Sequence, residues 1–167
     1  YNRVIFGYAP TKFKAEGESA TAHGFSAGWL GGYNVTKGKR LPLYIEPGVA
    51  MNMGFGEGMS ESDKLLNIEV PVNVTYRYNI PNTKIRLSPY FGFHCKVNVL
   101  CLDKDGLNWF DYDVLNRFQF GMQLGANIDF NRFSIGVGWN KDFIPFADFD
   151  GINMNTSGLR VNLGIVF

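Results

Sequence analysis

Hydrophobic residues alternate with polar or small residues along most of this chain. From Leu66 to Tyr78 every second residue is Leu, Ile, Val or Tyr, and no strongly hydrophobic residue lies between them. From Phe118 to Phe130 the same period of two recurs, and the other parity, which starts at Arg117, consists of Arg, Gln, Gly, Asn and Asp. A period of two places successive side chains on opposite faces of a β-strand. The pattern therefore predicts strands with one hydrophobic and one polar face.

Eight segments carry this alternation, and none shows a 3.6-residue repeat long enough to predict a helix. The predicted strands cover residues 2–8, 25–33, 43–55, 66–78, 85–99, 118–130, 133–139 and 159–167. Long connections (10–23, 56–65, 100–116 and 143–157) alternate with shorter ones (34–42, 79–84 and 131–132). At the shortest connection, Asn131 tolerates the positive φ of a two-residue hairpin. We therefore expect residues 1–167 to form a single domain, with the long connections gathered at one end.

The bulk and charge of the two faces predict which one points inward. In the last seven segments the hydrophobic parity carries 14 aromatic side chains, more than the narrow interior of an eight-stranded barrel accommodates. The other parity is rich in glycine, and from residue 25 onward it carries all the charged strand residues. A charge that faces lipid costs about 2–4 kcal/mol near the membrane midplane. We therefore expect an all-β fold, an eight-stranded antiparallel up-and-down transmembrane β-barrel. A soluble lipocalin-like carrier of apolar ligands is the inside-out alternative.

The polar parity predicts an interior network in which opposite charges pair. Its expected members are Glu46, Glu69, Arg77, Arg86, Tyr90, His94, Lys96, Arg117, Asp129 and Arg160. If the 79–84 turn sets a symmetric register, Glu69 lies opposite His94, and Arg77 lies opposite Arg86. An interior filled in this way leaves no open aqueous channel, unlike porins of 16–18 strands. A narrow channel for small solutes is the main alternative.

The long connections mix aromatic with acidic residues. Such a mixture can mark a partner surface, for which the candidates are Trp109, Phe110, Tyr112, Phe146 and Phe149. The alternative is that these loops pack against one another or against lipid headgroups. Asp103 and Asp105 are similar to the first half of a calcium loop, but the later ligands and the closing Glu of an EF-hand are absent. Asp and Gly also suit a turn, so we expect no metal site and no cofactor.

Several function classes fit the sequence poorly. A formal net charge of +1 argues against nucleic-acid binding, and an apolar run of at most four residues is too short for a transmembrane helix. Cys95 and Cys101 are predicted to be free thiols, because six extended residues separate them by too great a distance for a disulfide. His23 has no carboxylate in a position that the sequence forces. His94 faces the interior, where Glu69 opposite it would suit a buried polar ladder better than an active site. We therefore expect no enzyme, and a lipid-modifying outer-membrane enzyme is a less favoured alternative.

Four segments resemble small outer-membrane barrels. Residues 158–167 look like the β-signal of these proteins, with Leu163, Ile165 and the terminal Phe167 on one parity. Residues 66–78 are similar to the “LEIP…KYR” strand of the family that includes PorT-like proteins. Residues 88–92 and 121–125 resemble its “RPYxG” and “GxxxG” strands, with Ser88 where the pattern has Arg. The likeness extends to OmpX- and OmpA-type barrels and covers nearly the whole chain.

The resemblance implies residence in the bacterial outer membrane and a leader that is cleaved before Tyr1. It implies outer-membrane lipid and the barrel-insertion machinery as partners, the latter through the C-terminal strand. Other outer-membrane proteins are candidate partners. The expected function is that of a barrel without an open pore, which binds, scaffolds or serves as a subunit of a complex through its long-loop end.

Overall fold

The computed structural model describes residues 1–15, 18–36, 42–56, 64–102, 106, 108, 110, 115–149 and 152–167. The strands in this part of the chain are β1 (Asn2–Tyr8), β2 (Thr11–Ala15), β3 (Glu18–Gly31), β4 (Tyr33–Asn34), β5 (Leu43–Phe55), β6 (Lys64–Tyr76), β7 (Tyr78–Asn79), β8 (Ile85–Leu102), β9 (Phe118–Phe130), β10 (Phe133–Asp142), β11 (Ala147–Phe149) and β12 (Ile152–Val166). No helix in the described ranges is long and apolar enough to cross a membrane.

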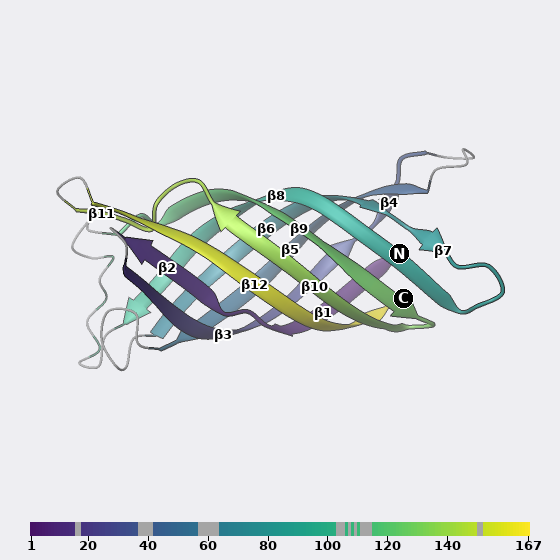
Figure 1. Cartoon of the computed structure of the whole chain (residues 1–167), viewed down its shortest axis with the longest axis horizontal. Coiled ribbons are helices and arrows are strands. Elements are labelled where there is room, and N and C mark those ends of the chain that lie inside the picture. Colours follow the sequence, from purple (N-terminus) through teal and green to yellow (C-terminus); the bar gives the residue numbers. More distant parts are fainter. Residues whose placement is uncertain are drawn as a thin grey trace.

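These strands form one closed antiparallel barrel with eight wall positions (Figure 1). β1 and β2 together make the first wall strand, since both pair with β3 on one side and with β12 on the other. The short strands β4 and β7 continue β3 and β6, and β11 folds back on β12. The β1–β12 pairing closes the sheet, so the described wall strands form a ring without an unpaired edge. The predicted eight-stranded barrel is confirmed.

Two of the predicted long connections contain strands instead. The segment 10–23 forms β2 and the first part of β3, which pair from Thr11↔Ala22 to Ala15↔Glu18. The segment 143–157 contains β11 and the start of β12. The barrel wall therefore extends beyond the predicted strands at the long-loop end, where Figure 1 shows β2 and β11 on the left. Both chain termini lie at the other end, beside the short turns.

Two turns test the predicted registers. Asn131 has a φ of 54°, and Phe130 pairs with Phe133, so the predicted tight hairpin is confirmed. The symmetric register about residues 79–84 is wrong by two residues: Glu69 lies opposite Lys96, and Asn79 lies opposite Arg86. The physical cause is a turn centred one residue later, in which the Ile80 amide donates to the Ile85 carbonyl over 3.0 Å and Asn82 adopts a φ of 58°.

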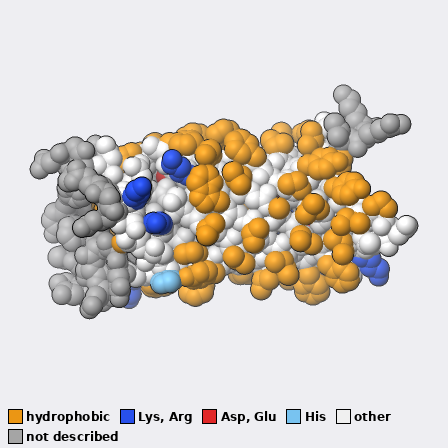
Figure 2. Space-filling model, viewed as in Figure 1, with side chains coloured by type: hydrophobic (Ala, Val, Ile, Leu, Met, Phe, Trp, Pro, Cys, Tyr) orange, Lys and Arg blue, Asp and Glu red, His pale blue; other side chains and the backbone are white. Residues whose placement is uncertain are grey.

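The hydrophobic face of the strands lies outside the barrel. Large hydrophobic side chains from every long strand are exposed, among them Phe25, Phe133 and Leu163 at 62%, 68% and 63%. On the face seen in Figure 2 they cover the barrel between its two ends. The largest fully buried side chains include Arg3, Glu46, Glu69 and His94. This is the reverse of a soluble barrel and excludes the lipocalin-like alternative.

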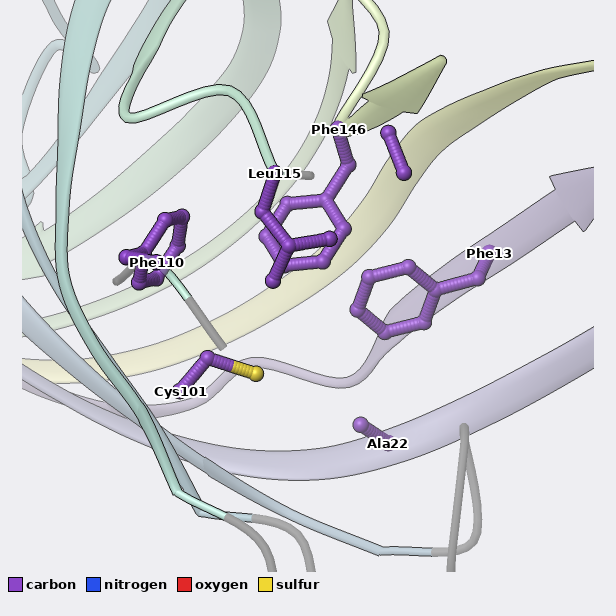
Figure 3. Packing of buried hydrophobic residues seen from close by; sticks show 7 residues of the cluster. Phe13, Ala22, Cys101, Phe110, Leu115 and Phe146 are labelled. Carbon is purple, nitrogen blue, oxygen red and sulfur yellow. The ribbon is translucent and has the colours of Figure 1, made fainter. Parts of the chain in front are cut away.

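A hydrophobic cluster closes the interior at the long-loop end (Figure 3). We call it the apolar plug, and its buried members are Phe13, Ala22, Cys101, Phe110, Leu115, Phe146 and Ala147. The rings of Phe13 and Phe146 meet edge to face at 5.4 Å, and those of Phe110 and Phe146 at 6.1 Å. Phe13 on β2 and Cys101 on β8 belong to opposite walls of the barrel, so the plug crosses the lumen.

Candidate functional site

The lumen of the barrel holds a polar network in three layers. The layer nearest the short turns is centred on Arg3 of β1. Its guanidinium donates to both carboxylate oxygens of Asp129 on β9 over 3.1 Å, and it lies 3.6 Å from Oε1 of Glu46 on β5. Arg77 adds a second cation, 3.2 Å from Asp129 Oδ2, and its guanidinium stacks over the Tyr1 ring at 3.4 Å. The layer ties together wall strands that are not neighbours.

Hydroxyl groups complete this first layer. Tyr1 and Thr75 both donate to Glu46, and Ser88 donates to Asp129 over 3.4 Å. Buried carboxylates need such partners, because an uncompensated charge in a low-dielectric interior is costly. Each of the two carboxylates therefore has cationic and hydroxyl neighbours.

The middle layer is an ion pair across the full width of the barrel. Arg160 on β12 donates to both carboxylate oxygens of Glu69 on β6, over 2.7 and 3.3 Å. Asn52 donates to Glu69 over 3.1 Å and to Asn67 over 2.8 Å. Tyr90 lies beside Arg160 on the wall of a cavity of about 20 Å³, which is room for about one water molecule. The lumen is thus constricted at this level.

The third layer surrounds Asp142 at the end of β10. His94 Nε2 lies 2.7 Å from one carboxylate oxygen, and Lys96 Nζ lies 2.8 Å from the other. The Thr156 hydroxyl also donates to Asp142, and Gln119 donates to Thr156 over 3.0 Å. The apolar plug lies beyond this layer, at the long-loop end.

The three layers balance their charges. The ion pairs of the described lumen use four cationic side chains, Arg3, Arg77, Lys96 and Arg160, and four anionic ones, Glu46, Glu69, Asp129 and Asp142. A balanced and paired interior holds its charges against one another and offers little attraction to an ion of either sign. The arrangement is suited to closing and bracing the barrel.

Eight of the ten side chains predicted for the interior line these layers, and two do not. Arg86 is half-buried at the short-turn end, where it donates to Asn79 Oδ1 over 2.7 Å. Arg117 is exposed at the long-loop mouth, where it donates to the Phe110 carbonyl over 3.4 Å. Both residues have the inward parity and lie at the ends of strands, and Arg86 lines a pocket together with Asp129 of the first layer. Their part in the interior network stays a prediction.

Two central members of the network were not predicted. Arg3 has the inward parity of the first segment, 2–8, whose alternation is faint. Asp142 continues the inward parity of Ser134, Gly136 and Gly138 beyond the predicted end of that strand at residue 139. Extending each period-two pattern until it breaks would have found both.

The loops were predicted to form an exposed partner surface, but the described aromatic members of that surface are buried. Phe110 and Phe146 are each only 2% exposed, because both rings pack into the apolar plug. Trp109 and Tyr112 lie outside the described residues, as does the side chain of Phe149. Two aromatic side chains of that set thus serve the interior and are inaccessible to a partner.

Possible catalytic and metal-binding groups are few in the described ranges. His23 faces outward and shares a hydrogen bond with the Tyr8 hydroxyl; its described contacts include no carboxylate. The described residues contain no group of three His, Cys, Asp or Glu that could hold a metal ion, and Asp103 and Asp105 lie outside those ranges. Cys95 is half-buried and Cys101 is buried, and the two form no disulfide with each other.

The fold and its inverted faces point to the outer membrane, and so does the comparison with known families. The family model described as “Outer membrane protein beta-barrel domain” matches residues 1–167. This chain belongs to that family. The bacterial outer membrane is therefore its location. Short turns of such barrels face the periplasm and longer loops face outward, so the apolar plug lies at the extracellular end.

Two solved structures share the fold of this family member. The neisserial surface protein NspA is 13% identical, with 99% of this chain and 97% of that chain covered and a TM-score of 0.57. The outer membrane enzyme PagL is 15% identical, with 99% of each chain covered and a TM-score of 0.59. No curated protein sequence matches the chain. At these identities the likeness concerns the fold.

Proposed function

We propose that this protein is a closed, non-conducting outer-membrane barrel that binds or scaffolds other components of the outer membrane. The observation that carries the proposal is the filled lumen. Three layers of paired charges cross it, and the apolar plug adds a fourth barrier at the extracellular end. A solute would have to break ion pairs such as Arg160–Glu69 in order to pass. A barrel that passes no solute would then act by binding other outer-membrane components at its exposed surface.

Conductance in planar lipid bilayers tests this proposal. Purified wild-type barrel is expected to give no stepwise current, whereas a porin measured in the same membrane gives clear steps. The double variant E69A/R160A removes the middle layer without changing the net charge. It is also expected to stay silent, because the Arg3 and Asp142 layers and the apolar plug remain.

Steady unitary currents from the wild type would overturn the proposal. They would favour the narrow channel if E69Q then changed the ion selectivity, since Glu69 would be lining the path. Each sample is also checked for a heat-dependent shift in gel mobility, which reports a folded barrel. This control ensures that the absence of current is not caused by unfolded protein.

The binding role is tested by photo-crosslinking in cells. A photoreactive residue is placed at Asn153 or Asn155, both exposed at the long-loop end, and at Lys84 in a short turn as the matched control. Discrete adducts at the first two positions and none at Lys84 are expected. Adducts confined to Lys84 would move the binding role to the periplasmic end.

The chemistry of the described residues favours a non-catalytic role. PagL, titled an outer membrane enzyme, shares only the fold with this chain. His23 has a tyrosine hydroxyl as its hydrogen-bond partner, and His94 is enclosed in the Asp142 layer. Overexpression is therefore expected to leave the mass spectrum of extracted lipid A unchanged. A new lipid A species that disappears in the H23A variant would instead establish an enzyme.

A further inference from the structure

Lysine side chains gather on the outer surface at the long-loop end. Lys12 and Lys14 on β2 and Lys141 on β10 are exposed, and Figure 2 shows basic side chains beyond the hydrophobic band at this end. Ion pairs between described residues use none of these three lysines. Among the described residues these three ammonium groups therefore have no ion-pair partner, and they lie beside the hydrophobic band of the barrel.

The strand registers arrange two of these lysines around hydroxyl groups. Ser157 on β12 lies directly opposite Lys141 on one side and Lys12 on the other. Lys12 in turn lies opposite Thr21 on β3. Two ammonium groups and two hydroxyls thus share one lateral row across four strands. This is a donor set that suits phosphate oxygens, because charge-assisted hydrogen bonds to an anion are the strong ones.

A surface groove of about 350 Å³ follows this row. Lys12, Thr21 and Ser157 form its polar side, and Trp139 and Leu159 form its hydrophobic side. Trp139 and Leu159 are paired across β10 and β12, one step nearer the membrane than the lysine row. Tryptophan with basic neighbours is typical of the level at which lipid headgroups lie. The groove therefore has the polarity of a headgroup site.

A second groove, of about 510 Å³, lies on the same side of the barrel at the level of the hydrocarbon. Its walls include the outward side chains Phe6, Tyr8, Phe25, Val161 and Leu163, and Ala27 forms a low point between them. Ala27 lies directly opposite Phe6. Its side chain is small, whereas the outward residues on either side of it along β3 are aromatic. An apolar depression of this kind fits an acyl chain.

The two grooves follow one another along the same strands. Leu159 lines the first and Val161, the next outward residue of β12, lines the second. Pro10 lines the first groove, and Tyr8, which lies opposite Val161, lines the second. A basic groove that is followed by an apolar groove has the order of polarity of a lipid with an anionic head.

We propose that β1, β2, β3, β10 and β12 bind one phosphorylated lipid of the outer leaflet, with a lipid A phosphate between Lys12 and Lys141 and an acyl chain over Ala27. The site is on the outer wall and does not depend on whether the lumen conducts. It gives the barrel one preferred lipid neighbour on one side, in addition to the general hydrophobic contact around its circumference.

Binding of two forms of lipid A to the folded barrel tests this site. Native mass spectrometry of the detergent-solubilised protein is carried out with lipid A that keeps its phosphates and with the same lipid after enzymatic dephosphorylation. The wild type is expected to bind the phosphorylated form at least tenfold more tightly. The variant K12Q/K141Q is expected to lose that preference. The matched control K64Q/K84Q removes the same charge from two exposed lysines outside the groove and is expected to keep it.

Two results would overturn the site. One is a wild type without preference for the phosphorylated lipid. The other is an equal loss in both double variants, which would mean a diffuse effect of positive charge.

A third variant tests the acyl groove. A27W fills the depression and is expected to weaken binding of both lipid forms at least fivefold. Unchanged binding by A27W would refute the acyl part of the site. All of these positions lie outside the lumen, and the heat-dependent gel shift checks that each variant is folded.

Discussion

Arg160 and Glu69 are 91 residues apart in the chain and meet across the full width of the barrel, with Nη2 2.7 Å from Oε2. The strands that carry them, β12 and β6, lie on opposite walls. The pair is therefore a strut that holds the two walls at a fixed separation. Removing one partner would leave a buried charge without compensation.

The first prediction concerns this strut. E69Q is expected to lower the free energy of unfolding by about 3–5 kcal/mol, because Arg160 keeps its charge and loses its counter-ion. The double variant E69M/R160M is expected to recover most of the loss, since an apolar pair in place of a buried ion pair is often neutral. Urea unfolding of barrels refolded in lipid vesicles, followed by tryptophan fluorescence, measures both. An E69Q variant as stable as the wild type would show that Arg160 is hydrated in the lumen.

The second prediction contrasts two neighbouring phenylalanines. Phe146 is 2% exposed in the apolar plug and Phe143 is 48% exposed. F146A is expected to cost about 3–5 kcal/mol, the usual range for emptying a packed aromatic site. F143A is expected to cost less than about 1 kcal/mol, because its ring is already half outside. The same urea titration gives both values. Equal costs would mean that the plug contributes little to stability.

The third prediction concerns the space that glycine leaves in the lumen. A Cβ at Gly125 would lie 2.6 Å from the Tyr90 hydroxyl oxygen and would also clash with the Val137 carbonyl oxygen. G125A is therefore expected to destabilise the barrel by about 1–3 kcal/mol through overpacking. At Gly54 the nearest atom would be 3.5 Å away, so G54A is expected to be neutral or slightly stabilising. Heating in SDS until the gel shift is lost ranks the two variants; the reverse order would refute the packing argument.

The fourth prediction concerns the lipid-facing side. Val70 lies near the middle of β6 and is 48% exposed. V70R is expected to cost about 2–4 kcal/mol if it lies near the midplane, whereas V70T, which keeps the shape without the charge, is expected to cost much less. Refolding into lipid vesicles compares them. A harmless V70R would place residue 70 outside the hydrocarbon.

The alternation of residue types was sufficient to predict the barrel. At Leu66–Tyr78 and Phe118–Phe130 the two parities differ so sharply that both the strands and their orientation to lipid follow from the sequence. The Asn131 hairpin followed for a local reason, because a two-residue turn between paired phenylalanines restricts the backbone to positive φ. These features depend on neighbouring residues alone.

The pairing of interior charges could not be predicted in the same way. A shift of one residue in a turn centre moves every cross-strand partner by two, and this is how Glu69 comes to face Lys96 and not His94. Asp142 bonds to His94 and Lys96 from a strand two places away, a contact set by closure of the sheet. The burial of Phe110 and Phe146 likewise depends on how loops fold over the mouth, for which the sequence carries no periodic signal.

The layered lumen has a consequence for how the protein assembles. Arg3 and Asp129 are 126 residues apart, and His94 and Asp142 are 48 apart, so no hairpin contains both partners of either pair. Each charge stays hydrated in an open sheet and loses that water only when β1 reaches β12. Closure and dehydration of the interior are thus a single late event with a high entropic cost. Insertion of this barrel should therefore be slow and all-or-none, and a machine that holds β1 and β12 together would accelerate it.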